Sequence, residues 1–217
     1  MHTWAIISQK GGQGKTTLAT GFAVEAARDG ASVVILDTDD RQGTASYWEN
    51  ARAADDVTVV NTGIAVLPLN LAKAEKGQAD LVIIDTPANS RDIATEAARA
   101  ADFVLIPVVP RAFDIASVLQ TVKQIKQEGT PFAVVLSQVK HTGSEADDTA
   151  ASFVGMGVVV LTARLHDRKD FSNAVGLGQA ATEYDPKGKA AAELRAAFDE
   201  VKRLSDFATK RAKRGTT

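Results

Sequence analysis

Cysteine is absent from this 217-residue chain, and histidine occurs only three times. Without cysteine, the protein has no disulfide bonds, iron–sulfur clusters, thiolate zinc sites or cysteine nucleophiles. The histidines, at positions 2, 141 and 166, are too scattered in the sequence to indicate a metal site. Any metal is therefore expected to be a hard cation bound through oxygen atoms.

Long apolar segments are also missing. No run of eighteen apolar residues occurs, so we expect no membrane-spanning helix. The first ten residues, MHTWAIISQK, have neither the charged start nor the small-residue cleavage site of a signal peptide. Together these absences predict a cytoplasmic protein. The length suits one domain, residues 1–217, with a mostly aliphatic core because aromatic residues make up only 6%.

Short apolar runs alternate with amphipathic segments along most of the chain. The runs are β-branched and nearly continuous, which favours strands buried on both faces of a parallel sheet. The alternation predicts a doubly wound α/β fold, a mostly parallel sheet flanked by helices, with ligands at the carboxyl ends of the strands. Gly30 and Gly129 should end helices in the left-handed conformation. The expected strands are 4–7, 33–36, 57–60, 81–84, 103–108, 132–136 and 158–161, and the expected helices are 16–28, 43–52, 91–101, 114–127 and 189–208.

Residues 10–17 read KGGQGKTT and lie between an expected strand and an expected helix. In that context a glycine-rich segment predicts the phosphate-binding loop of a P-loop NTPase. Its backbone N–H groups and the helix N-terminus would bind phosphates, Lys15 would reach the β- and γ-phosphates, and the Thr16 hydroxyl would coordinate Mg²⁺. The predicted cofactors are therefore ATP and Mg²⁺. The predicted nucleotide-binding residues are Gly11, Gly12, Gln13, Gly14, Lys15, Thr16 and Thr17.

Three carboxylates follow expected strands. Asp85 ends an apolar run and is a candidate to hold a Mg²⁺-bound water; the alternative is an ordinary strand-end turn. Asp37 and Asp39 follow the second expected strand and would point the same way if the backbone is extended. Asp39 could then orient the attacking water, with Asp37 nearer the metal, whereas the alternative is a polar turn.

These motifs resemble those of the ParA/MinD family. The segment 10–17 is similar to its deviant Walker A motif, whose mark is an extra lysine, here Lys10, before the glycines. Residues 37–43, DTDDRQG, are similar to the family's second motif. Residues 81–87, the segment IPVVP at 106–110 with Asp114 after it, and the ending at 164–169, Gly178 and 186–193 resemble the ParA branch in particular.

The resemblance implies a cycle of assembly. Lys10 would cross an ATP-sandwiched homodimer to contact the partner's nucleotide, acting with Lys15 and Asp39 in catalysis. ATP binding would drive dimerisation, and slow hydrolysis, stimulated by a ParB-like or cargo-adaptor protein, would reverse it. The family positions DNA or other large cargo over the nucleoid through non-specific binding of duplex DNA. The expected function is thus an ATP-dependent partition or positioning ATPase, cytoplasmic and nucleoid-associated.

The chain departs from the family pattern in three respects. Asp40 replaces the usual proline of the second motif, which could loosen that loop. Ser137-Gln138 stands where many relatives carry an asparagine for base recognition, so a preference for adenine is implied by the family rather than by the site. The sequence also has no N-terminal extension with a helix-turn-helix, as in short ParA-type proteins.

Charge is unevenly distributed. Residues 187–217 hold nine Lys or Arg and four Asp or Glu, so this basic helix and tail carry +5 while the whole chain carries −2. A basic end on an acidic body indicates a polyanionic partner, although a solvated helix with a frayed tail is the alternative. Arg168 and Arg195 are the first choices for non-specific DNA contact. The basic candidates are Arg164, Arg168, Lys169, Lys187, Lys189, Arg195, Lys202 and Arg203, and the predicted DNA-binding set is Arg164, Arg168, Lys169, Arg195, Lys202 and Arg203.

Two rival functions remain. A MinD-like membrane-cycling ATPase would end in a free amphipathic helix, but the last expected helix has an apolar stripe typical of core packing, and residues 209–217 contain no large apolar side chain. No membrane partner is therefore expected. A P-loop ATP-dependent ligase or synthase would need a small-molecule site, and the sequence offers no acid, base or nucleophile cluster beyond the nucleotide motifs.

Overall fold

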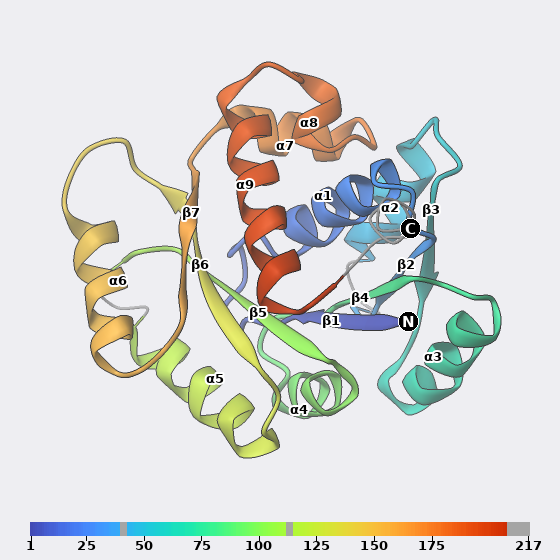
Figure 1. The fold of residues 1–217 in the computed structure, drawn as a ribbon, viewed down its shortest axis with the longest axis horizontal. Helices are drawn as coiled ribbons and strands as arrows, with labels where there is room; N and C mark the ends of the chain where they lie inside the picture. Colours follow the sequence, from blue (N-terminus) through green and yellow to red (C-terminus); the bar gives the residue numbers. More distant parts are fainter. Residues whose placement is uncertain (40–42, 112–114, 208–217) are drawn as a thin grey trace, which may run out of the picture.

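The computed structural model describes residues 1–39, 43–111 and 115–207, and its centre is one parallel sheet (Figure 1). The strand order is β3-β2-β4-β1-β5-β6-β7, and every pairing between neighbours is parallel. The predicted fold class is therefore confirmed. The strands are β1 (His2–Ile6), β2 (Val33–Asp37), β3 (Val57–Asn61), β4 (Leu81–Asp85), β5 (Phe103–Val108), β6 (Phe132–Val139) and β7 (Val160–His166).

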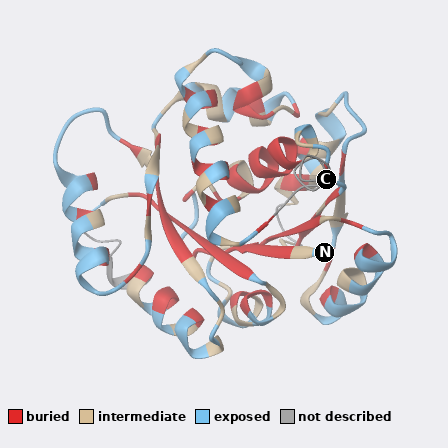
Figure 2. Ribbon diagram, viewed as in Figure 1, coloured by how far each residue is buried: buried red, intermediate tan, exposed pale blue. Residues whose placement is uncertain are grey.

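Helices cover both faces of the sheet (Figure 1). One apolar cluster joins the sheet to α1, α2, α7, α8 and α9, and a second joins it to α3, α4, α5 and α6. Figure 2 shows the central strands buried along nearly their whole length, as continuous aliphatic runs require. The helices are α1 (Lys15–Arg28), α2 (Thr44–Ala51), η1 (Ile64–Val66), α3 (Leu67–Lys76), α4 (Arg91–Ala100), α5 (Ile115–Glu128), α6 (Glu145–Gly155), α7 (Lys169–Gly176), α8 (Ala181–Tyr184) and α9 (Lys189–Leu204).

The strand order reverses at β1. The chain passes from β1 to β2, β3 and β4 on one side, whereas β5, β6 and β7 extend the other side. In such sheets the crevice at the carboxyl ends of the strands, beside the reversal, is where ligands bind. The register places Ile6 level with Asp85, and Asp85 level with Asp37, so three strand ends meet at one edge. The loops after β1, β2 and β4 therefore surround one site.

The sequence predictions fail mainly around β7. The expected strand 158–161 is wrong, because the strand runs from Val160 to His166. The polar residues Thr162, Arg164 and His166 are typical of a loop sequence. However, β7 is an edge strand, in which only alternate side chains enter the core. The short helices η1, α3, α6, α7 and α8 had no prediction at all.

Most predicted helix ends agree with the structure to within one residue, but the predicted end at 208 is wrong, because α9 ends at Leu204. Gly30 and Gly129 have φ values of 86° and 75°, so both adopt the expected left-handed conformation after a helix. Asp114 and Ala208, the predicted ends of two helices, lie outside the described residues, as do Asp40 and the tail beyond Phe207.

Candidate nucleotide site

The glycine-rich loop connects β1 to α1. Gly12 and Gly14 have φ values of 70° and 85°, a conformation that glycine adopts at little cost. Gly11 has no positive φ; a Cβ added there would meet the Ala88 Cβ at 3.8 Å, an ordinary contact. The loop borders a cavity of about 780 Å³, which the predicted nucleotide-binding residues line: Gly11, Gly12, Gln13, Gly14, Lys15, Thr16 and Thr17.

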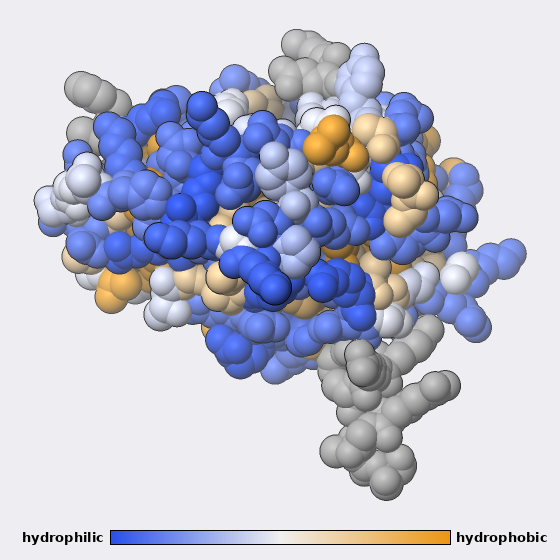
Figure 3. Space-filling model, turned by 90° about the horizontal axis from the view of Figure 1, so that it is seen from above, coloured by the Kyte–Doolittle hydropathy of each residue, from blue (hydrophilic) through white to orange (hydrophobic). Residues whose placement is uncertain are grey.

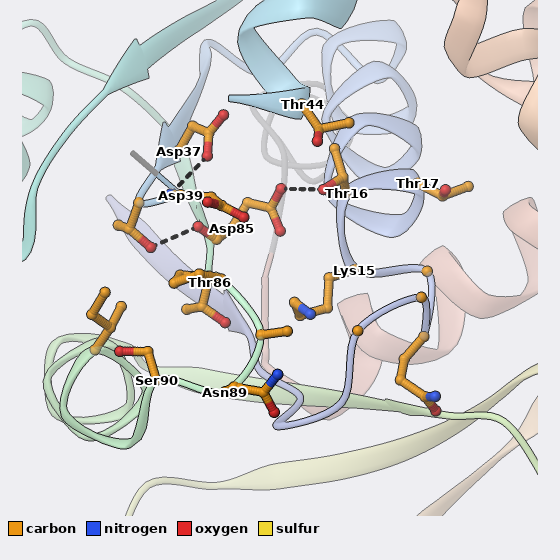
Figure 4. A pocket seen from close by; sticks show the side chains of 18 of the residues that line it. Lys15, Thr16, Thr17, Asp37, Asp39, Thr44, Asp85, Thr86, Asn89 and Ser90 are labelled. Atoms are coloured by element: carbon orange, nitrogen blue, oxygen red, sulfur yellow. Dashed lines mark hydrogen bonds between the residues drawn. The ribbon is translucent and has the colours of Figure 1, made fainter. Parts of the chain in front are cut away.

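Lys15 begins α1 and is buried against carboxylates (Figure 4). Burial lowers the pKa of its ammonium group, while the nearby Asp85 and Asp39 carboxylates oppose that shift. No acidic residue occupies the first turn of α1. A positive side chain at an uncapped helix N-terminus, in a cavity of this size, can bind a polyphosphate.

Thr16 and Asp85 are joined directly. The Thr16 hydroxyl donates a hydrogen bond of 2.7 Å to Asp85 Oδ2, whereas Asp85 Oδ1 is buried and has no hydrogen-bond partner. Burial raises the pKa of the Asp85 carboxyl to about 7, against the hydrogen bond from Thr16, with Asp37 raising it further. An unpaired buried carboxylate oxygen beside a hydroxyl fits a hard cation or its bound water. These residues therefore fit Mg²⁺.

Asp37 lies in the same cavity but has a structural role as well. Its Oδ1 accepts the N–H of Asp39 at 3.0 Å, and its Oδ2 accepts the N–H of Ala45 at 3.2 Å. Burial raises the pKa of the Asp37 carboxyl, and the backbone donors oppose that shift. Asp37 thus fixes the start of α2 relative to β2. Both of its oxygens are engaged, so Asp85 is the better placed of the two for a metal.

Asp39 and Lys10 differ in position. Asp39 is half-buried and lines the cavity, so its carboxylate shares the site with Lys15 and Asp85 (Figure 4). Lys10 is exposed and is not among the residues that line the cavity. The structure therefore brings together all the predicted catalytic and metal residues except Lys10, which faces outward.

The cavity also contains residues for which the sequence predicts no catalytic, metal-binding or phosphate-binding role. Thr86 donates a hydrogen bond of 2.8 Å to the carbonyl of Ile6, and Thr38 donates one of 2.8 Å to the carbonyl of Asp85. Both threonines are buried, and no sequence pattern predicts which carbonyl a single threonine hydroxyl will contact. The further lining residues are Thr38, Thr44, Thr86, Pro87, Ala88, Asn89, Ser90, Ile93 and Gln138.

Gln138, at the departure from the family's asparagine, is bonded to the phosphate loop. Its Nε2 donates to the carbonyl of Gly12 at 2.5 Å, and the neighbouring Ser137 hydroxyl donates to the carbonyl of Gln13 at 2.9 Å. A second cavity of about 220 Å³ adjoins the loop at Gly14 and Thr17 and extends to α7 and the end of β7. The end of β6 therefore supports the loop between the two cavities.

The candidate DNA-contacting residues do not form one group. Arg164 points toward α6, where its Nη2 lies 2.6 Å from Asp147 Oδ1, while the other candidates belong to α7, α9 or the loop before α7. Arg195 donates to the carbonyl of Pro186 at 3.1 Å, and Lys202 lies 2.6 Å from Asp29. Lys169 and Arg203 are exposed.

Arg168 is held by Glu193. Its Nε and Nη2 donate to Glu193 Oε1 at 3.0 and 2.7 Å, and the other carboxylate oxygen accepts the N–H of His166 at 3.0 Å. Burial alone would raise the pKa of Glu193, but these donors hold the pKa below its ordinary value. Replacing Arg168 by glutamate would place two carboxylates together, so that variant is a poor test of DNA contact.

Replacing Glu193 by glutamine should reduce the free energy of unfolding at pH 7 by about 1.5 kcal/mol, the lower end for charged hydrogen bonds because the pair is partly exposed. Since the pKa of Glu193 is lowered by folding, this stabilisation is present above the unfolded-state pKa and is lost as pH falls through the folded-state pKa. Urea unfolding of both proteins at pH 7 and near pH 4 measures the difference, which should shrink in acid.

Glu200→Gln is the matched control. Glu200 lies on α9 like Glu193 and accepts the N–H groups of Thr162 and Ala163 of β7, but among the described ion pairs it contacts no arginine. An unchanged difference between wild type and Glu193→Gln from pH 7 to pH 4 would contradict the assigned ion pair.

The structure also brings two histidines together. The rings of His141 and His166 stack with centroids 4.8 Å apart, although 25 residues separate them in sequence. Two histidines that are distant in the sequence are therefore neighbours in the structure. Within the described ranges, no group of three or more His, Cys, Asp or Glu side chains is arranged to hold a metal. Over the same ranges, no helix is long and apolar enough to span a bilayer.

Known proteins that are similar to this chain include nucleotide-binding proteins, in agreement with the nucleotide site described above. The model of the CobQ/CobB/MinD/ParA nucleotide binding domain matches residues 4–180. The chain is 28% identical over 208 residues to the maintenance of carboxysome distribution protein A of Halothiobacillus neapolitanus, covering 92% of this chain and 95% of that protein. It is 27% identical over 181 residues to protein ParA of Rhizobium radiobacter, covering 79% and 81%.

A similar fold occurs in a solved structure, the septum site-determining protein MinD of Pyrococcus horikoshii in complex with Mg-ADP. Its TM-score is 0.80 at 19% identity, covering 96% of this chain and 99% of that one. The family model covers most of the chain, including the phosphate loop and all three carboxylates of the cavity. The chain is a member of the CobQ/CobB/MinD/ParA nucleotide-binding domain family.

Proposed function

We propose that this chain is a positioning ATPase: it binds ATP and Mg²⁺, dimerises, binds DNA without sequence preference and hydrolyses ATP slowly. The observation that carries the proposal is the cavity where Lys15, Thr16 and Asp85 meet beside the glycine-rich loop. Relatives named for carboxysome distribution and ParA support a positioning role. The adaptor is proposed to be a ParB-like or cargo-bound protein, and the location cytoplasmic and nucleoid-associated.

The proposed chemistry divides among four side chains. Lys15 and the loop N–H groups bind the phosphates, and Thr16 with Asp85 would hold Mg²⁺ through oxygen. The ion supplies positive charge against the phosphate oxygens. Asp39, which faces the same cavity, orients the attacking water and accepts its proton.

The proposed dimer depends on Lys10. Its exposure outside the cavity lining is what a residue needs to reach a nucleotide on a second subunit. An ATP enclosed between two subunits carries more negative charge than Lys15 and Mg²⁺ offset, so a lysine supplied by the partner is favourable. A stable dimer therefore requires bound ATP.

For DNA, we propose the face formed by α7, α9 and the loop between α8 and α9. Figure 3, which looks down from the α7–α8 side of Figure 1, shows a mainly hydrophilic surface with small apolar spots. Exposed cations on this face are Lys169, Lys187, Lys189 and Arg203. Phosphate contacts need only positive charge and donors, so the binding should be non-specific.

The ATP-bound protein is expected to bind unrelated duplexes with equal affinity, and the ADP-bound protein should bind weakly. Dimerisation doubles the phosphate contacts on one surface, and each contact releases counterions. The logarithm of the affinity for DNA should therefore fall linearly with the logarithm of the salt concentration, with a slope of about −0.9 per phosphate contacted. Fluorescence anisotropy with two unrelated duplexes, at several salt concentrations and with either nucleotide, measures this.

Lys169→Ala and Arg203→Ala should weaken binding to both duplexes alike and make the salt slope shallower, with ATP binding unchanged. Lys76→Ala is the matched control, because Lys76 ends α3 on the opposite face of the sheet. If the ATP-bound protein bound no DNA, or bound anionic liposomes instead, the positioning role on DNA would be wrong and the membrane-cycling rival would be favoured.

One observation weighs against the membrane-cycling rival. Leu194, Phe198 and Val201 of α9 are 1–2% exposed and pack in the core, so this stretch of the helix is not a free amphipathic segment. For the ligase or synthase rival, the second cavity beside the loop is the place where a small substrate could bind. ATP turnover that required an added small-molecule acceptor would favour that rival.

A further inference from the structure

Asn89 has an unusual backbone conformation in the nucleotide cavity. Its φ is 57°, in the left-handed region that residues other than glycine rarely adopt, although asparagine does so more readily than most. It lies in the segment between β4 and α4 and lines the same cavity as Lys15 and Asp39. A strained residue at a ligand cavity is a candidate for a functional role, provided that its side chain has one.

The segment between β4 and α4 is hydrogen-bonded to the end of β1 and to the residues just after it. The N–H of Asn89 donates to the carbonyl of Gln9 at 3.0 Å, and the Thr86 hydroxyl donates to the carbonyl of Ile6 at 2.8 Å. The Asn89 N–H is therefore already used within the protein. The donor that position 89 can offer to a ligand is the side-chain carboxamide.

The Asn89 carboxamide lies at the nucleotide cavity. In Figure 4 the Asn89 side chain lies on the same side of the cavity as Lys15, opposite Asp37, and reaches toward the space beside the Lys15 ammonium group. No hydrogen bond of this side chain to another described residue is seen, and it is exposed to the cavity. A phosphate bound by Lys15 would lie within reach of both groups, since the carboxamide can rotate to present Nδ2.

We propose that Asn89 is a specificity-determining residue: its Nδ2 donates a hydrogen bond to the terminal phosphate of a bound nucleoside triphosphate, so that the site distinguishes triphosphate from diphosphate. The inference rests on the proposed function, because it requires ATP in this cavity. It goes further by assigning the discrimination to one side chain outside the glycine-rich loop. A diphosphate lacks the group that Asn89 would contact, so ADP should not depend on this residue.

The Asn89→Gly variant separates side chain from backbone, because glycine adopts the left-handed conformation without strain and keeps the N–H that donates to Gln9. Its affinity for a non-hydrolysable ATP analogue should fall about tenfold or more, the loss expected for a hydrogen bond to a charged group. Its affinity for ADP should change by less than about twofold, because ADP lacks the phosphate that Asn89 would contact. Calorimetric titration of both nucleotides gives the ratio, and thermal unfolding checks the fold.

Two further variants complete the experiment. Gln78→Gly makes the same change at a left-handed position between α3 and β4, away from the cavity, and should leave the ratio of the two affinities unchanged. Asn89→Asp keeps the shape but replaces the donor by a negative charge, so it should weaken analogue binding more than Asn89→Gly does.

The outcomes distinguish this inference from the proposed function. If wild type binds the analogue and Asn89→Gly has the same analogue-to-ADP ratio, the role of Asn89 is wrong and the proposed function stands. If Asn89→Gly weakens both nucleotides equally, the residue shapes the cavity and does not select the triphosphate. If wild type binds neither nucleotide, both the inference and the proposed function fail.

Discussion

Lys15→Ala should bind ATP and ADP at least about a hundredfold more weakly than wild type, the loss expected when two hydrogen bonds to charged groups are removed. Lys15 is buried at the N-terminus of α1, and the Asp85 and Asp39 carboxylates raise the pKa of its ammonium group against the effect of burial. Removing its charge leaves these carboxylates facing the phosphates, so repulsion adds to the lost contact. Calorimetric titration of each nucleotide with Mg²⁺ measures the effect.

Lys10→Ala is the matched control, since it removes a lysine from the same loop that is exposed and outside the cavity lining. It should retain nucleotide binding by the monomer and lose the ATP-dependent dimer, which light scattering with a non-hydrolysable analogue detects. A Lys15→Ala protein that bound ATP as well as wild type would contradict the assignment of the cavity. A Lys10→Ala protein that dimerised normally would contradict the ATP-sandwich dimer.

Asp39→Ala should bind ATP normally while hydrolysis falls about a hundredfold or more, the effect typical of losing a group that orients and deprotonates the attacking water. The substitution spares the loop, because Asp39 contributes its N–H to Asp37 and its carbonyl to the N–H of Gly43, and alanine keeps both. The ATP-bound dimer should therefore persist. Phosphate release and light scattering on the same sample measure both effects.

Asp37→Ala is the informative comparison. Asp37 accepts the N–H groups of Asp39 and Ala45, so its loss should loosen the start of α2 and lower the thermal unfolding temperature as well as activity. Asp39→Ala should lower that temperature less, because it keeps both backbone hydrogen bonds of position 39. If Asp39→Ala hydrolysed ATP at the parental rate, the water-orienting group would have to be Asp85 or a residue of the segment between β4 and α4.

Much of the sheet was predictable because its strands are buried on both faces. A continuous aliphatic run such as residues 81–84 predicts a buried strand without any knowledge of its neighbours in the sheet. The edge strand β7 was displaced in the prediction, since one side of it faces α9 and Thr162 and Arg164 interrupt the apolar pattern. The short helices α7 and α8 were not predicted, because segments of eight and four residues are too short to show a helical periodicity.

For the site, the chain order of the motifs was enough to predict one cavity. Parallel strands with an α/β crossover place all their carboxyl ends at one edge, so the phosphate loop, Asp37 and Asp85 had to meet there. The sequence could not predict which carboxylate keeps an oxygen free of hydrogen bonds for a metal ion. The hydrogen bonds that occupy Asp37 come from Asp39 in the following loop and from Ala45 in α2, and the unpaired oxygen of Asp85 results from the burial of its strand end.

By itself, the sequence determined the fold class, the phosphate loop and the three carboxylates, because each depends on residues that are adjacent or periodic along the chain. Only the tertiary structure decided what the isolated side chains do. Arg168 is held by Glu193, 25 residues away, and His141 stacks on His166 across a similar separation. Asn89, whose backbone is left-handed, donates its N–H to the carbonyl of Gln9, 80 residues earlier in the sequence. Such contacts join residues distant in sequence, and no local pattern of charge or hydrophobicity encodes which partners the packed sheet and helices bring together.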